Sequence, residues 1–264
     1  MTTTDLPGGS PAGKMAPPEE VGEFAEEEPR LRVRVWDRVV RTTHWLIALS
    51  LLSLAITGIY IGKPYIVVPG PAGQHFVMGW MKIIHFYSAI VFTLAVLSRI
   101  LWMFVGPRRA RWWNFIPTTK ARWRDLTGTF RFYTFLKVDP PPAVGHNALA
   151  GFAYAFVFLL YLVMIVTGLA MYSVNADVGS AMRSFSFLLP VFGGPQMARW
   201  IHHVTMWLLI GFFVHHLYSA VYMAIVDKTG VIDSMFSGNK WIPRSLINKD
   251  REAQRNFEDR GAHE

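Results

Sequence analysis

Apolar residues gather in four long runs, at residues 42–62, 83–105, 146–174 and 200–226, and Arg99 is the only Lys, Arg, Asp or Glu within them. A helix of about 20 apolar residues crosses the hydrocarbon core of a bilayer. Backbone groups in lipid need partners within the protein, which favours helices for such spans. The pattern therefore predicts an all-α integral membrane protein, a bundle of four transmembrane helices.

The two ends of the chain are polar. Residues 1–29 are rich in Pro, Gly and Glu, and they lack the apolar stretch of a signal peptide. This composition predicts a disordered acidic tail. We therefore expect a membrane domain at residues 30–250 and a polar cytoplasmic tail at residues 251–264.

The basic residues predict how the helices are oriented. Arginines cluster at residues 30–41, and eight Lys and Arg residues lie between the second and third runs, whereas the other two connections carry few. An excess of Lys and Arg marks cytoplasmic segments. Both termini and the middle connection are therefore predicted to be cytoplasmic, which accounts for the net charge of +8 without a nucleic-acid partner.

The middle connection has a further pattern, because Trp112, Trp113 and Trp123 alternate with its basic residues. Such a mixture is typical of an amphipathic segment at the membrane surface. The chain has no cysteine. It therefore has no disulfide, no covalently attached c-type haem and no iron–sulfur cluster held by its own thiolates.

Four histidines of the apolar runs fall at two depths. With the predicted orientation, His85 and His202 lie toward the outer face, and His44 and His216 lie toward the cytoplasm. An ionisable side chain in the membrane is costly and indicates a functional site. Each depth draws one histidine from each of two helices, which is how a helix bundle holds a cofactor.

Helical phase selects among the adjacent histidines of the fourth run. At about 100° per residue, His202 and His216 differ by only about 40°, and they are about 21 Å apart in depth at about 1.5 Å per residue. If His203 replaces His202, or His215 replaces His216, the two histidines of the pair differ by about 120° to 140° around the helix. We expect these two neighbours to hydrogen-bond to backbone, to a cofactor carboxylate or to another helix.

Two axial imidazoles are what the iron of a b-type haem accepts. The histidine pairs therefore predict two haems, an outer one at His85 and His202 and an inner one at His44 and His216. A single membrane histidine is more often an interhelical hydrogen-bonding residue. Copper or zinc would require tighter clusters of mixed ligands.

Three further positions are candidates for supporting roles. Arg99 lies fourteen residues after His85 and would pair with haem propionates or extend to the lipid headgroups. Gly58 lies fourteen residues after His44 and would leave room for a flat macrocycle or serve ordinary helix packing. His146, at the start of the third run, would bind a quinone oxygen, relay protons or simply be solvated.

A short internal similarity is also present. The first run ends in Ile56-Thr57-Gly58, and the third run contains Val166-Thr167-Gly168 toward the same face. It reflects either an old duplication or small residues that ease contact between helices.

Over residues 34–248 the chain resembles the b-type cytochrome subunits of membrane-bound nickel–iron hydrogenases, within the bacterial diheme four-helix cytochrome b family. The resemblance is carried by an ordered set of motifs: Val39-Val40-Arg41-Thr42-Thr43-His44-Trp45-Leu46, Thr57-Gly58, Ile61-Gly62-Lys63-Pro64, Ile84-His85-Phe86, Ser98-Arg99-Ile100, Phe104-Val105-Gly106, Gly145-His146-Asn147, His202, Met206-Trp207-Leu208, His216-Leu217-Tyr218 and Val231-Ile232-Asp233-Ser234-Met235.

The resemblance implies a multi-pass protein of the bacterial inner membrane that carries two haem b groups on His44, His85, His202 and His216. Such a subunit is not a complete enzyme. It passes electrons from the iron–sulfur small subunit and the nickel–iron large subunit of a periplasmic hydrogenase to membrane quinone. Two alternatives are the cytochrome b subunit of a formate dehydrogenase or thiosulfate reductase, and a membrane transporter without cofactor.

Overall fold

The computed structural model describes residues 28–65, 69–70, 76–107, 110–112, 115, 120–134, 136, 148–227 and 229–248. Several sequence predictions lie outside these residues. They are the disordered state of almost all of the acidic tail, the polar tail at 251–264 and the placement of His146 and Trp113.

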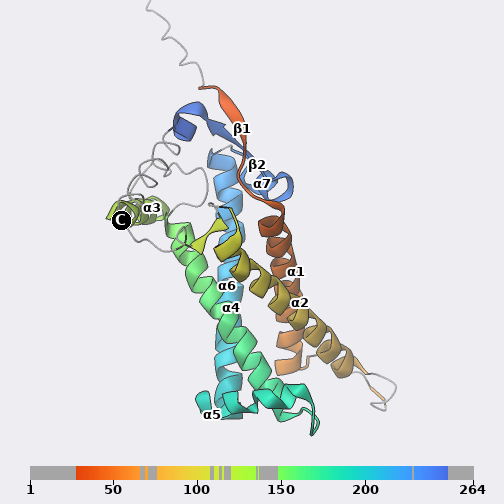
Figure 1. Ribbon diagram of the computed structural model, residues 1–264. Helices are drawn as coiled ribbons and strands as arrows, with labels where there is room; N and C mark the ends of the chain where they lie inside the picture. Colours follow the sequence, from red (N-terminus) through yellow and green to blue (C-terminus); the bar gives the residue numbers. More distant parts are fainter. Residues whose placement is uncertain are drawn as a thin grey trace, which may run out of the picture.

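Four helices are long and apolar enough to cross a membrane, which confirms the predicted bundle. They are α1 (Arg38–Gly62), α2 (Val77–Val105), α4 (Ala148–Val174) and α6 (Pro195–Asp227). In Figure 1, α1 lies beside α2 and α4 lies beside α6, and these are the two most extensive helix contacts among the described residues. The bundle is thus built from two helical hairpins.

The helices α1 and α6 begin before the apolar runs because local capping decides where they start. Asp37 is the N-cap of α1, and its carboxylate accepts the Val40 N–H at 2.9 Å and the Trp102 indole N–H at 3.0 Å. Helix α6 begins at Pro195. Proline is favoured at a first helical position, since no helical partner is needed there for an N–H.

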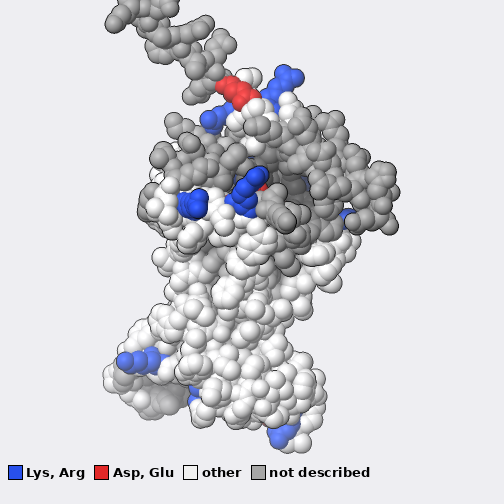
Figure 2. Space-filling model, turned by 90° about the vertical axis from the view of Figure 1, so that its left-hand side faces the viewer, with Lys and Arg blue, Asp and Glu red and all other residues white. Residues whose placement is uncertain are grey.

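The surface of the bundle is suited to lipid. Figure 2 shows basic residues at the two ends of the molecule and an uncharged belt between them. Many large apolar side chains of the four helices are exposed there, including Leu49, Leu94 and Leu159. This surface is costly in water and is stable in hydrocarbon.

A buried apolar cluster joins the four helices near the middle of their length. Phe92 of α2 and Tyr161 of α4 meet edge to face with ring centroids 5.1 Å apart. Val96 and Leu209 are 0% and 1% exposed within the same cluster. This packing unites the two hairpins, because direct contact between α1 and α6 is sparse.

One end of the molecule contains a two-stranded ribbon that the sequence patterns did not predict. Strand β1 (Arg30–Arg34) pairs antiparallel with β2 (Asn239–Pro243), with Arg32 opposite Trp241. Figure 1 shows the ribbon, α3 (Lys120–Tyr133) and α7 (Val231–Ser237) at this ribbon end. The ribbon places the segments before α1 and after α6 on the same side of the bundle.

The opposite end contains the short helices η3 (Ala181–Phe187) and α5 (Leu188–Val191), and we call it the α5 end. At the ribbon end, α3 falls within the predicted surface segment and includes Trp123. The arginine pattern predicts that the ribbon end is cytoplasmic.

Helix α7 is fastened to the start of α1. Hydrogen bonds run from Trp36 Nε1 to Ser234 Oγ, from Trp45 Nε1 to the Met235 carbonyl and from the Arg41 guanidinium to the Phe236 carbonyl. The helix ends at Gly238, whose carbonyl accepts the N–H groups of Val35 and Trp36 at 2.8 and 3.1 Å.

Gly238 is the position in this contact that only glycine fits well. Its φ of 84° lies in the left-handed region, and a Cβ atom there would lie 2.7 Å from the backbone oxygen of Trp36. We predict that Gly238→Ala destabilises the protein by about 1–3 kcal/mol. The expected observation is a lower melting temperature of the detergent-purified protein.

The matched control is Gly128→Ala. Gly128 lies within α3 and has no atom within 4 Å of its Cβ position, so alanine should be neutral or favourable there. Equal melting temperatures for the two variants would contradict the role given to Gly238.

Candidate functional site

The candidate residues of the four helices recur at intervals of seven. Seven residues rise about 10.5 Å and return to within about 20° of the same face. The four helices therefore contribute to three successive layers. The outer layer, toward the α5 end, contains Gly58, His85, Gly168 and His202. The middle layer contains Leu51, Phe92, Tyr161 and Leu209. The inner layer, toward the ribbon end, contains His44, Arg99, Tyr154 and His216.

In the outer layer each histidine is hydrogen-bonded to a threonine of the other helix in its hairpin. Nδ1 of His85 on α2 lies 2.9 Å from Thr57 Oγ1 on α1. Nδ1 of His202 on α6 lies 2.9 Å from Thr167 Oγ1 on α4.

The glycines after these threonines admit the imidazole rings. A Cβ atom on Gly58 would lie 3.3 Å from His85 Cε1 and 3.7 Å from Met206 Sδ, and one on Gly168 would lie 3.6 Å from His202 Cε1. Gly58 therefore lies beside a histidine, and its predicted role next to a macrocycle stays a prediction. The sequence interpretation did not select Gly168 as a site residue. The feature of the sequence that could have identified Gly168 was the similarity between Ile56-Thr57-Gly58 and Val166-Thr167-Gly168.

The inner layer brings His44 of α1 and His216 of α6 together. Their ring centroids are 6.3 Å apart, with the planes tilted by 59°. One metal ion bound between two imidazole nitrogens, each about 2 Å away, separates the ring centroids by roughly 6 Å. The spacing therefore suits two axial ligands on one iron.

Other aromatic rings surround the inner pair. His216 stacks on Phe212 with centroids 5.6 Å apart, and Tyr154 of α4 meets His216 edge-on at 6.1 Å. His44 Nδ1 is buried and has no hydrogen-bond partner among the described residues. Tyr154 was not selected from the sequence, although it lies fourteen residues before Gly168, the interval that separates His44 from Gly58.

Arg99 is buried in the inner layer, with 7% of its surface exposed. Its guanidinium donates to the carbonyl of Ala110 at 3.3 Å and lies over the Phe115 ring, 5.5 Å from the centroid. These contacts join α2 to the chain that follows it. Its predicted contact with haem propionates stays a prediction.

The two neighbouring histidines of α6 have separate contacts. His203 Nδ1 lies 2.8 Å from the carbonyl of Arg199, and its Nε2 faces Gly62 at the end of α1. His203 therefore bonds to backbone, one of the alternatives expected from its phase. His215 is exposed, and its Nε2 lies 3.5 Å from Ser219 Oγ.

The donor set fits haem better than a small metal site. Among the described residues, no three His, Asp or Glu side chains are grouped so that they could hold a metal ion. The apolar layers instead present histidines in twos, from different helices, and the outer two lie beside Gly58 and Gly168. Two imidazoles from different helices are ligands that would hold the iron of a b-type haem.

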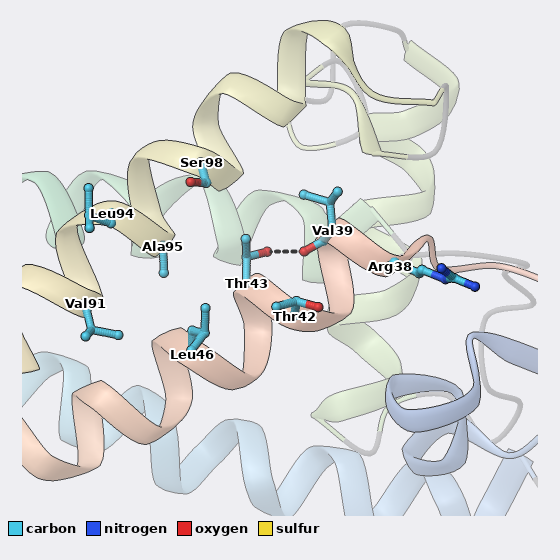
Figure 3. Close-up of a pocket in the computed structure, with 9 residues that line it drawn as sticks. All are labelled: Arg38, Val39, Thr42, Thr43, Leu46, Val91, Leu94, Ala95 and Ser98. Atoms are coloured by element: carbon cyan, nitrogen blue, oxygen red, sulfur yellow. Dashed lines mark hydrogen bonds between the residues drawn. The ribbon is translucent and has the colours of Figure 1, made fainter.

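A groove of about 470 Å³ lies between α1 and α2 near the ribbon end. Figure 3 shows the residues that line it, Arg38, Val39, Thr42, Thr43, Leu46, Val91, Leu94, Ala95 and Ser98. At about 100° per residue, its α1 positions lie on the face opposite His44. The groove is therefore separated from the inner histidine pair by the width of α1.

Comparisons with known proteins identify the family of this chain. The family described as prokaryotic cytochrome b561 matches residues 35–238. A probable Ni/Fe-hydrogenase B-type cytochrome subunit of Cupriavidus necator is 38% identical over 207 residues, 77% of this chain and 85% of the relative. A protein of the same name from Rhizobium leguminosarum bv. viciae is 36% identical over 234 residues, 88% of this chain and 95% of the relative.

A probable Ni/Fe-hydrogenase 1 B-type cytochrome subunit of Escherichia coli K12 is 36% identical over 210 residues, 77% of this chain and 88% of the relative. The family match covers all four apolar helices, and these identify a multi-pass protein of the bacterial inner membrane with b-type haem. The chain belongs to the prokaryotic cytochrome b561 family, and the relatives compared above are named probable Ni/Fe-hydrogenase B-type cytochrome subunits.

Proposed function

We propose that this protein is the diheme membrane anchor of a periplasmic nickel–iron hydrogenase and passes electrons from hydrogen oxidation to membrane quinone. The main support is the stacking of two histidine pairs, with His202 and His216 fourteen residues apart on α6. The names of the relatives support the hydrogenase partner.

The outer haem is assigned to His85 and His202, and the inner haem to His44 and His216. When bound, the two haems supply one-electron redox chemistry. Gly58 and Gly168 leave space beside the outer histidines. Arg99 is the candidate partner for the propionates of the inner haem, because a guanidinium suits carboxylates.

The middle layer keeps water out of the space between the two sites. Phe92, Tyr161 and Leu209 are 3%, 8% and 1% exposed. A dry and closely packed interior lets electrons pass between fixed sites while it opposes the movement of hydrated ions. This is what an electron-transfer subunit in an energised membrane requires.

The partner would dock at the α5 end. The arginine distribution predicts that this end is periplasmic, and the outer histidine pair lies toward it. Because the chain has no cysteine, the iron–sulfur clusters that deliver electrons must belong to the hydrogenase small subunit, with the nickel–iron centre in the large subunit.

The groove between α1 and α2 is the candidate site for quinone. Exposed apolar side chains line it, which suits an isoprenoid tail, and Arg38, Thr42 and Ser98 add polar groups near the ribbon end. A quinone there would lie about one helix diameter, roughly 10 Å, from the inner pair. A role for His146 in quinone or proton binding is proposed from the sequence alone.

Two alternatives are less well supported. The hydrogenase names among the relatives favour this partner over formate dehydrogenase or thiosulfate reductase. The paired histidines of the apolar layers favour a cofactor protein over a cofactor-free transporter.

The haem assignment predicts selective losses. A reduced-minus-oxidised spectrum of the purified protein should show two low-spin b haems per chain. His202→Ala should remove the outer haem and retain the inner one, because only the outer haem loses a ligand. His203→Ala is the control and should retain both. Absence of haem from the wild type, or equal loss from both variants, would contradict the assignment.

The partner assignment predicts which donor reduces the haems. In native membranes, hydrogen should reduce both haems, formate should not reduce them, and thiosulfate should not reoxidise them through this chain. Deletion of the gene for this protein should abolish hydrogen-dependent quinone reduction and leave reduction of an artificial acceptor by the hydrogenase intact. Reduction by formate alone would favour the alternative partner.

The quinone assignment predicts the effect of filling the groove. Ser98→Phe should lower the rate of quinone reduction at least about tenfold, which corresponds to about 1.4 kcal/mol of lost binding or activation free energy, and should not change haem content. Leu97→Phe is the matched control, since this exposed neighbour does not line the groove. Unchanged rates in Ser98→Phe would exclude the groove as the quinone site.

A further inference from the structure

We propose that Thr57 and Thr167 are positioning residues that set the protonation pattern of the outer histidines, and that this makes the outer haem more reducing than the inner one. The inference rests on the proposed function, because it assumes haem between His85 and His202. It concerns two residues outside the axial ligand set.

The first step is the hydrogen-bond direction at Thr57. A hydroxyl group has one hydrogen to donate. Thr57 Oγ1 lies 2.7 Å from the Ser53 carbonyl and 3.3 Å from the Leu54 carbonyl, and both of these groups can only accept. The hydroxyl hydrogen is therefore directed to the backbone. Toward His85 Nδ1, at 2.9 Å, the same oxygen must accept.

Thr167 repeats this arrangement in the second hairpin. Its Oγ1 lies 2.6 Å from the Val163 carbonyl and 3.2 Å from the Met164 carbonyl, so it accepts from His202 Nδ1 at 2.9 Å. Both histidines therefore have their proton on Nδ1.

A proton on Nδ1 leaves the lone pair on Nε2, which is the form of imidazole that binds a metal. The threonines are well placed to hold it, because they are 3% and 0% exposed and their side chains are fixed by the backbone bonds. A glycine follows each one and lies beside the ring. Thr57-Gly58 and Thr167-Gly168 are thus two copies of one histidine-holding device.

The inner pair is held differently. His44 Nδ1 has no partner among the described residues, and His216 is held by ring contacts with Phe212 and Tyr154. A hydrogen bond from Nδ1–H raises the basicity of the ligand nitrogen. A more basic ligand favours ferric iron and lowers the reduction potential. The outer haem should therefore have the lower potential, which makes electron transfer toward the ribbon end favourable.

The test uses the haem-loaded, full-length protein with Thr57→Val and Thr167→Val. Valine keeps the shape and removes the acceptor. A redox titration should resolve two haem components, and one should move to higher potential in each variant. When a metal-binding histidine loses the hydrogen-bond partner of its other ring nitrogen, the metal affinity falls by about tenfold or more. If this loss falls on the ferric form, the rise is about 59 mV for one electron.

Controls separate this role from packing. Thr57→Ser and Thr167→Ser keep the oxygen and should restore the wild-type potentials and the electron paramagnetic resonance signal of the outer ferric haem. Thr129→Val removes a buried threonine with the same bond to its own helix, 2.7 Å to the Asp125 carbonyl, in a helix without histidine. It should shift neither component.

Each outcome decides the inference. If both haems are present and the valine variants leave both potentials and the resonance signal unchanged, the inference is wrong while the proposed function stands. An equal shift of both haems would also overturn it. If a valine variant loses the outer haem, retention in the serine variant supports the inference, and loss in both contradicts it. A wild type without two haems would refute the proposed function itself.

Discussion

The structure depends on the need to pair every polar group that enters the hydrocarbon layer. In hydrocarbon, a hydrogen-bonding group without a partner raises the free energy of the protein by roughly several kcal/mol. Thr57 and Thr167 meet this need twice, since each bonds to its own helix and to a histidine of the neighbouring helix. Within each hairpin, these polar contacts therefore hold the two helices together at the outer layer. Apolar packing holds one hairpin against the other.

The two ends of the bundle differ in how they are held together. At the ribbon end the chain before α1 and the chain after α6 are tied by strand pairing and by α7. Asp37 links α1 to Trp102 of α2 at this end. The inner histidine pair thus lies next to the most cross-linked part of the protein, and the outer pair lies toward the shorter connections.

Sequence patterns were sufficient for the four membrane-spanning helices and for the choice of candidate histidines. The runs needed only length and composition, and the phase of His202 and His216 needed only the helical period. The patterns did not predict the β1–β2 ribbon, because strands of five residues at opposite ends of the chain have no local signal for their pairing. They gave little weight to Thr167 and Gly168, since a tripeptide similarity does not show which ring it contacts.

The sequence by itself determined the four spans, the absence of thiolate chemistry and the two depths of histidine, because these follow from composition and from a fixed rise per residue. Only the tertiary structure decided that Thr57 contacts His85 and that Thr167 contacts His202. It also decided that His44 and His216 lie 6.3 Å apart and that Arg99 reaches Ala110. The physical reason is that contacts between helices depend on their relative rotation and tilt, which side-chain packing sets.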